Sequence, residues 1–121
     1  RITAIDLNTG DHAWMVPNGD TPDNVKNHSL LRDVELPRTG KPSRPMLMVT
    51  KTLLFSGEGL GGGPVFRAHD KATGETVAEI ELPATVTGLP ITYMHEGRQY
   101  IVVAVGSSGY RAGLVALALP D

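Results

Sequence analysis

A glycine-rich segment, residues 57–62, has the residue types and spacing of a possible ligand-binding loop. Its glycines match G-x-G-x-x-G, the spacing of loops that hold dinucleotide phosphates. Such a loop must follow a strand and open a helix, because the helix N-terminus offers free amide groups to the phosphate. Residues 64–68 continue instead as a strand-like pattern. We therefore predict a flexible hairpin tip here and no nucleotide site.

Histidine and serine side chains could act as metal ligands or nucleophiles, but their spacing favours structural roles. The chain has no cysteine, and none of its four histidines has metal-ligand spacing: His12, His28, His69 and His95. Surface or hydrogen-bonded core positions are expected for most of them, while His28 lies in a long loop and stays open. The serines lack the G-x-S-x-G elbow of an activated nucleophile. We predict no catalytic residue and no metal ligand in this chain.

A basic trio, Arg38, Lys41 and Arg44, lies in a proline- and glycine-rich approach to a strand. One interpretation is a solvated loop. The other is an anion site, because arginine binds carboxylates through two parallel hydrogen bonds. Pro42 and Pro45 would hold Arg44 stiffly at the start of that strand.

The composition limits which secondary-structure elements can position these residues. The chain has 121 residues, enough for one small domain, and 40% of them are hydrophobic. A net charge of −2 argues against nucleic-acid binding by phosphate neutralisation. Fourteen glycines and nine prolines favour short strands and turns over long helices. No apolar run reaches transmembrane length, and the first residue is an arginine inside a strand-like pattern, so a segment of a longer protein is expected.

An internal repeat gives the strands their order. Residues 4–11 and 68–75 both read A-x-D-x-x-T-G-acid, 64 residues apart, and residues 115–120 form a degenerate third copy without the aspartate. In each intact copy the aspartate would accept hydrogen bonds from turn amides, and the glycine would supply a positive φ. The motif therefore predicts a hairpin turn, and Asp6 and Asp70 are expected to be turn-forming residues.

Short apolar segments between the copies complete four-stranded antiparallel units, which is typical of the blades of an all-β propeller. The long segment 17–42 shows only weak helix signals, so a loop with one helical turn is expected there. The predicted domain, 1–121, divides into strands C and D of one blade (1–16), a long inter-blade loop (17–42), a full blade (43–82) and strands A to C of the last blade (87–120).

Strand direction predicts which loops share a face. The segments 17–42, 57–63 and 106–113 should all emerge at one end of the blades, where elaborated loops commonly carry function. On inner strands opening toward that face stand four candidate ligand-binding residues: Arg44, Met46, Thr87 and Gly88.

Several segments resemble a known family. Residues 4–14 look like the tryptophan-docking motif of quinoprotein propellers, and residues 66–75 are similar to their R-A-x-D-x-x-T-G-E. Residues 88–94 and 97–104 resemble the G-x-P-x-T-Y and G-[KR]-Q-Y-[IV]-V-V-A segments of C-terminal blades in membrane-bound glucose dehydrogenase-like quinoproteins. The likeness covers nearly the whole chain.

That resemblance implies about two and a half blades of an eight-bladed propeller that binds pyrroloquinoline quinone (PQQ) and a calcium-type divalent cation. It implies a periplasmic enzyme that oxidises a sugar or alcohol and passes electrons to a quinone or cytochrome. The general base and most quinone contacts would lie in earlier blades. This chain would supply one wall of the quinone pocket, including the four candidates, and would be inactive and free of cofactor alone.

Two positions depart from the family pattern. Glucose-oxidising members carry a histidine after a glycine pair in the loop that corresponds to residues 106–113, and this chain has none there. Glucose is therefore a doubtful substrate. The second repeat has Ala78 where the motif usually has tryptophan, so one docking contact between blades should be lost.

Two other functions remain open at this point. One is a non-catalytic propeller with the same repeats that acts as a protein-interaction scaffold, and the other is a self-contained β-domain that binds sugar or protein. The 17–42 segment and the G-x-P-x-T-Y segment favour the enzyme. Because incomplete blades expose strand edges, we also expect the isolated chain to self-associate.

Overall fold

The chain folds into nine strands and two single helical turns in a computed structural model that describes residues 1–120. Asp121 lies outside the described residues. The strands are β1 (Ile2–Ile5), β2 (His12–Val16), β3 (Arg44–Val49), β4 (Leu53–Leu60), β5 (Val65–Asp70), β6 (Thr76–Glu81), β7 (Ile91–His95), β8 (Arg98–Ser107) and β9 (Tyr110–Ala118). The helical turns are α1 (Asp23–Lys26) and the 3₁₀ helix η1 (Ser29–Leu31). Neither is long or apolar enough to cross a membrane, and no other helix occurs in residues 1–120.

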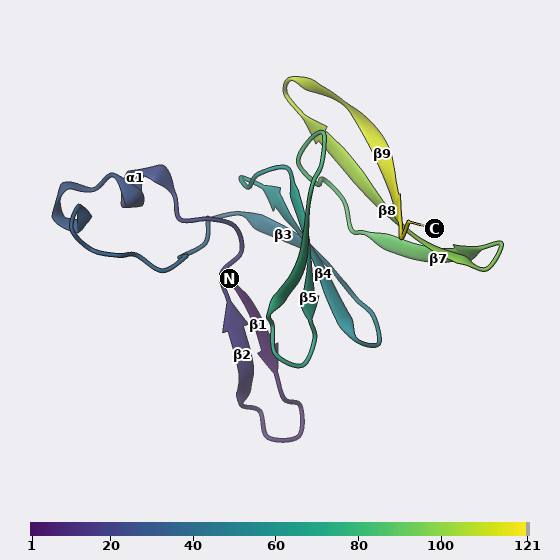
Figure 1. The fold of residues 1–121 in the computed structure, drawn as a ribbon, viewed down its shortest axis with the longest axis horizontal. Helices are drawn as coiled ribbons and strands as arrows, with labels where there is room; N and C mark the ends of the chain where they lie inside the picture. Colours follow the sequence, from purple (N-terminus) through teal and green to yellow (C-terminus); the bar gives the residue numbers. More distant parts are fainter. Residues whose placement is uncertain (121) are drawn as a thin grey trace.

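The strands form three antiparallel sheets that follow one another along the chain (Figure 1). The first sheet pairs β1 with β2, the second has the order β3-β4-β5-β6, and the third has the order β7-β8-β9. Sequential antiparallel order within separate sheets is the arrangement of propeller blades. The expected all-β blade architecture is confirmed.

The repeated turns have the geometry that their sequence predicts. Asp70 accepts hydrogen bonds at Oδ1 from the backbone amide of Ala72 at 2.8 Å and from that of Thr73 at 3.0 Å. Asp6 accepts one from the amide two residues further along, also at 2.8 Å. The glycine that closes each turn has a φ of +79°. Side-chain acceptor and left-handed glycine therefore fix the hairpin between β1 and β2 and that between β5 and β6.

Trp14 fastens the first sheet to the second. Its indole Nε1 donates a hydrogen bond to the carbonyl of Lys71 at 3.0 Å, across the turn between β5 and β6. The ring lies so close to Gly74 that an added Cβ there would stand 2.6 Å from it. The docking contact between blades that the motif in residues 4–14 implies is therefore present.

The main apolar core joins the second sheet to the third. Its buried members come from β5, β8 and the link between β6 and β7: Phe66, Leu82, Ala84, Val86, Val103 and Val105. Gly57 in β4 meets Val86 so closely that an added Cβ would lie 2.6 Å from the valine side chain. Position 57 therefore requires glycine, because the Val86 side chain packs directly onto its backbone.

Two of the loops expected from the sequence are mostly strand. The structure extends β4 to Leu60, so the expected loop 57–63 shrinks to a turn, and β8 and β9 leave only residues 108–109 of the expected loop 106–113. Register explains the first difference, because Met46 pairs with Gly57 and Arg44 with Leu60 across a bulge. The glycines of this segment lie within the ladder and its bulge rather than in an open loop.

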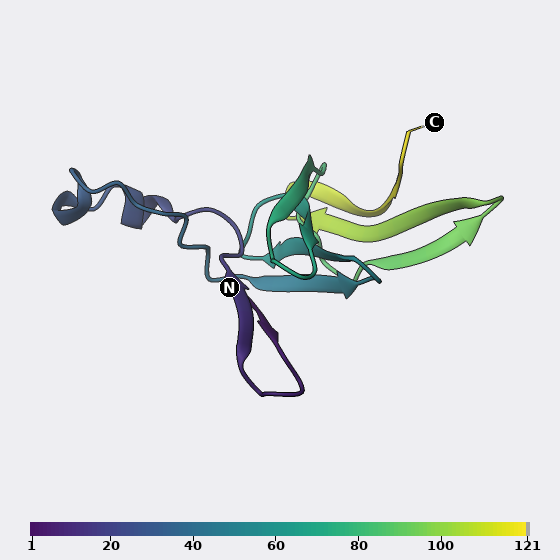
Figure 2. The same cartoon turned by 60° about the horizontal axis from the view of Figure 1, so that its bottom comes forward.

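The segment between β2 and β3, which we call the excursion (residues 17–43), projects away from the sheets in both views (Figures 1 and 2). It is mainly irregular, but it contains two helical turns, α1 and η1, where one was expected from the sequence. Its two ends are tied together, because the Lys41 amide donates to the Asn18 carbonyl at 2.8 Å and the Thr39 amide donates to Thr21 Oγ1 at 3.0 Å.

Candidate functional site

The connections between sheets gather at one end of the strands. Register places the start of β3 opposite the end of β4, and Val86 opposite Val105 near the end of β8. The excursion, the turn after β4, the link to β7 and the β8–β9 hairpin therefore share this end, which we call the loop face. The β3–β4 turn, the β7–β8 turn and the two D-x-x-T-G hairpins occupy the other end.

Arg44 and Met46 lie on the inner strand of the second sheet. Arg44 opens β3 at the loop face, is exposed to solvent, and makes no side-chain hydrogen bond or ion pair within residues 1–120. Met46 is half-buried and packs against the apolar core. Arg44 is therefore available to an anion, whereas Met46 contributes apolar surface beside it.

Thr87 and Gly88 precede β7 at the corresponding position of the third sheet. The Thr87 amide donates to the Ala104 carbonyl at 2.9 Å, and its side chain is exposed. The contact between Gly57 and Val86 brings the strand partner of Met46 next to this segment. No hydrogen bond among residues 1–120 joins Arg44 to Thr87 or Gly88, so the four candidates share a face without forming a bonded cluster.

An ion cluster whose central pair is buried lies beside the loop face. Arg67 in β5 donates from Nη1 to Glu58 Oε1 and from Nε to Glu79 Oε2, both at 2.7 Å. The second oxygen of Glu58 accepts the Gly63 amide at 2.5 Å, which pins the turn after β4. The Arg67 and Glu58 side chains are each only 3% exposed. This pair fixes the end of β4 close to Arg44.

The pKa values of this pair favour the charged forms. Burial raises the pKa of Glu58, but the Gly63 amide, Arg67 and the charge of Lys41 together bring it below its usual range. Burial lowers the pKa of Arg67, and its two carboxylate partners more than offset that effect. Both groups therefore stay ionised, Glu58 through the Gly63 amide and Arg67, and Arg67 through its two carboxylate partners.

Asn18 links this cluster to the excursion. Its side-chain amide donates to Ser43 Oγ at 2.8 Å and to the Glu58 carbonyl at 3.3 Å. The residue is buried, and within residues 1–120 its Oδ1 atom has no hydrogen-bond partner. Asn18 thus holds the base of the excursion against β4 and sets where Arg44 begins its strand.

His69 is a buried core histidine with satisfied ring nitrogens. Its Nδ1 lies 3.2 Å from both the Gly74 carbonyl and the Thr76 hydroxyl oxygen. A proton on Nδ1 allows it to donate to the carbonyl, which can only accept. Nε2 then accepts a hydrogen bond from the Ser56 hydroxyl at 2.9 Å. The prediction of a structural role is confirmed for His69. His28 also has a local role, since its Nδ1 accepts the Leu30 amide at 3.3 Å at the start of η1.

Acidification should destabilise the protein through His69. Burial and the charges of Arg67 and Arg38 lower its pKa despite the opposing bond to Gly74. In the unfolded chain its pKa is about 6.5, so only the unfolded state takes up this proton as the pH falls through that value. Stability should therefore be full above about pH 6.5 and decline below it. Urea unfolding of wild type and His69→Gln between pH 7.5 and 5 checks this.

In that experiment the exposed residue His12 provides the control. His12→Gln should keep the wild-type pH dependence, whereas His69→Gln should flatten it over the same range. A wild-type stability that does not change between pH 7.5 and 5 would contradict the assignment of His69 as a neutral buried group.

Sequence reasoning missed the Glu58–Arg67–Glu79 cluster. A signal was present, because the D-x-x-T-G turn sets the β5–β6 register and places Arg67 directly opposite Glu79. The position of Glu58 beside Arg67 could not be predicted from this register, because it depends on β4 continuing through the glycine-rich segment. No group of three or more potential metal-binding side chains gathers within the described chain.

The sequence of this chain is similar to a known protein family and to several individual proteins. Residues 1–101 match the family described as the β-propeller domain of PQQ glucose, ethanol and alcohol dehydrogenases. Over 99% of its length the chain is 32% identical to quinoprotein glucose dehydrogenase of Gluconobacter oxydans, and equally identical to a probable quinate dehydrogenase (quinone) of Xanthomonas campestris pv. juglandis. Over 36% of its length it is 41% identical to methanol dehydrogenase [cytochrome c] subunit 1 of Paracoccus denitrificans, of which that match covers 7%. The chain spans 15% and 16% of the first two relatives.

Proposed function

Because the chain belongs to the β-propeller family of PQQ-dependent dehydrogenases, we propose that it forms part of the propeller of such an enzyme and one wall of its quinone pocket. Its three sheets are then the outer half of one blade, a complete blade, and strands A to C of the last blade. The wall is the loop face, where the inner strands of the second and third sheets begin.

The exposed guanidinium of Arg44 is the observation that carries this proposal. PQQ is a polycarboxylate, and an arginine without an internal partner is suited to bind a carboxylate through two hydrogen bonds. Asn18 and Ser43 fix the chain immediately before Arg44, so the side chain starts from a rigid base. Met46 adds apolar surface, and Thr87 and Gly88 lie in the link just before the neighbouring inner strand, β7.

When bound, PQQ supplies the two-electron oxidation of the substrate, and the protein binds and orients it. The role of this chain is limited to binding. Arg44 holds a carboxylate of the quinone, and the packed inner strands exclude water from that side of the pocket. The chain alone is then inactive, because the family's general base lies outside these residues.

The parent enzyme is proposed to oxidise a sugar or alcohol and to pass electrons to a quinone or a cytochrome. Relatives named for quinate and for methanol support a substrate range wider than glucose. A periplasmic location and a calcium-type cation are also proposed for the parent, on the family resemblance. The scaffold alternative gains no support from these comparisons.

Replacement of Arg44 should weaken PQQ binding. In the full-length enzyme, Arg44→Ala should raise the Kd for PQQ by about 10- to 100-fold, the effect of losing a charge-assisted hydrogen bond. Arg44→Lys should give an intermediate loss, because lysine keeps the charge but not the paired donors. Titration of the cofactor-free enzyme with PQQ gives these constants.

Lys51→Ala is the matched control, since Lys51 is exposed at the opposite end of the same sheet. It should leave the Kd unchanged. An unchanged Kd for Arg44→Ala would remove Arg44 from the pocket wall, whereas a full-length protein that binds no PQQ would overturn the proposed function as a whole.

A further inference from the structure

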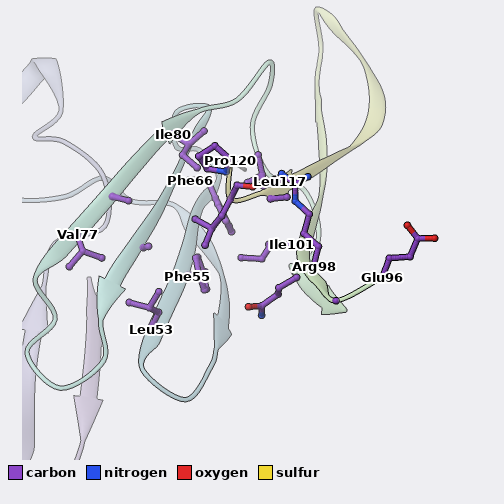
Figure 3. Close-up of a pocket in the computed structure, with 16 residues that line it drawn as sticks. Leu53, Phe55, Phe66, Val77, Ile80, Glu96, Arg98, Ile101, Leu117 and Pro120 are labelled. Carbon is purple, nitrogen blue, oxygen red and sulfur yellow. Dashed lines mark hydrogen bonds between the residues drawn. The ribbon is translucent and has the colours of Figure 1, made fainter. Parts of the chain in front are cut away.

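An apolar cavity of about 720 Å³ lies between the second and third sheets, at the end opposite the loop face (Figure 3). Its walls come from β4, β5 and β6 on one side and from β8, β9 and the residues after β9 on the other. Figure 3 shows Phe55, Phe66, Ile101 and Leu117 directed into it, with Glu96 turned outward. Ala78 in β6 also lines it, and we call this cavity the Ala78 socket.

The same repeat position is filled by an indole between the first and second sheets. Trp14 stands four residues after Gly10, and Ala78 stands four residues after Gly74. The Trp14 ring lies against Gly74 of the next sheet. Since Ala78 offers only a methyl group toward the third sheet, the space corresponding to the Trp14 ring opens into the socket.

The hydrogen-bond acceptor for such a ring is also repeated. Trp14 donates to the carbonyl of Lys71, the residue after Asp70. In the third copy Ala118 takes the place of Asp70, so Leu119 corresponds to Lys71. Ala118 and Leu119 both line the socket. The Leu119 carbonyl accepts a hydrogen bond from the Arg98 guanidinium. A carbonyl oxygen has two lone pairs and can accept a second donor.

We propose that the Ala78 socket binds a planar aromatic molecule of the indole class, with its ring between the two sheets and its N–H directed to the Leu119 carbonyl. The stacked rings of Phe55 and Phe66, whose centroids are 5.9 Å apart, form the aromatic part of the wall. The space is partly open to solvent, and an aromatic ring seated in it would exchange water for packing contacts with the apolar walls. The site is separate from the loop face and does not depend on the quinone.

Titration with indole, followed by calorimetry, tests the proposal on the wild-type protein. Saturable binding with a Kd below about 1 mM is expected, in the range open to a small ligand that is largely buried. Ala78→Trp should fill the socket from within, raise the Tm and weaken indole binding at least tenfold. Glu81→Trp places a tryptophan on the same strand outside the socket and should bind indole as wild type does.

Two further measurements separate the alternatives. Leu117→Trp narrows the socket from the opposite wall and should also weaken indole binding, so the test does not rest on one variant. Thianaphthene, which lacks the N–H, should bind several times more weakly than indole. Absence of saturable binding to wild type, or equal binding by both socket variants, would overturn the proposal, and equal binding of thianaphthene would overturn the bond to Leu119.

Discussion

Replacing Arg67 with methionine should lower the free energy of unfolding by about 3–5 kcal/mol, the cost of leaving a buried charge without its partner. The group left behind is Glu58, which is almost fully buried and whose other carboxylate oxygen is held by the Gly63 amide. Its pKa should rise in the variant, because burial is no longer offset by the arginine. Urea unfolding at pH 7 measures the loss.

Glu79→Gln is the matched control for that experiment. Glu79 bonds the same guanidinium, but its side chain is 51% exposed, so the solvent screens the pair. A loss of less than about 1 kcal/mol is expected for this variant. Equal losses for Arg67→Met and Glu79→Gln would mean that burial of Glu58 is not the origin of the effect.

Gly74→Ala should destabilise the protein by about 2–5 kcal/mol through two additive effects. The left-handed backbone at position 74, with a φ of +79°, costs about 1–2 kcal/mol for any residue with a Cβ. The added methyl group would also meet the Trp14 ring at 2.6 Å, and overpacking of this kind costs about 1–3 kcal/mol. Urea unfolding gives the total.

Gly10→Ala separates the two effects, because the first repeat offers the same backbone without the contact. Gly10 also has a φ of +79°, yet an added Cβ there meets nothing within 4 Å. This variant should lose only the backbone contribution. If the two alanine variants were equally unstable, docking of Trp14 onto the neighbouring turn would contribute nothing measurable.

The turn motif made the second sheet predictable from the sequence. The aspartate and glycine of D-x-x-T-G fix a hairpin by local hydrogen bonds and a local φ, so no distant contact is needed to place β5 and β6. The tryptophan four residues after the glycine likewise pointed to the next sheet. These features are encoded within a few residues of one another.

The glycine-rich segment shows where local reasoning fails. Its composition favours a loop, but the ladder with β3 and the close approach to Val86 make residues 57–60 part of β4. Glycine there serves contact between sheets, which depends on residues almost 30 positions away. The assignment of Arg44, Met46, Thr87 and Gly88 to a binding site stays a prediction. The ion cluster of Glu58, Arg67 and Glu79 could not be predicted in full, because Glu58 lies on that unexpected part of β4.

Hydrogen bonds close the base of the excursion, so the sequence of its outer part can be changed without moving the flanking strands. Since Asn18 and Lys41 are bonded to each other and Thr21 to Thr39, both flanking strands meet the same fixed ends whatever lies between residues 22 and 37. Each doubling in the length of such a loop costs only about 0.6 kcal/mol. Insertions, deletions or grafted sequences at this tip should therefore be tolerated while the sheets keep their geometry. The propeller can acquire a different recognition surface at its edge through a change in one segment alone.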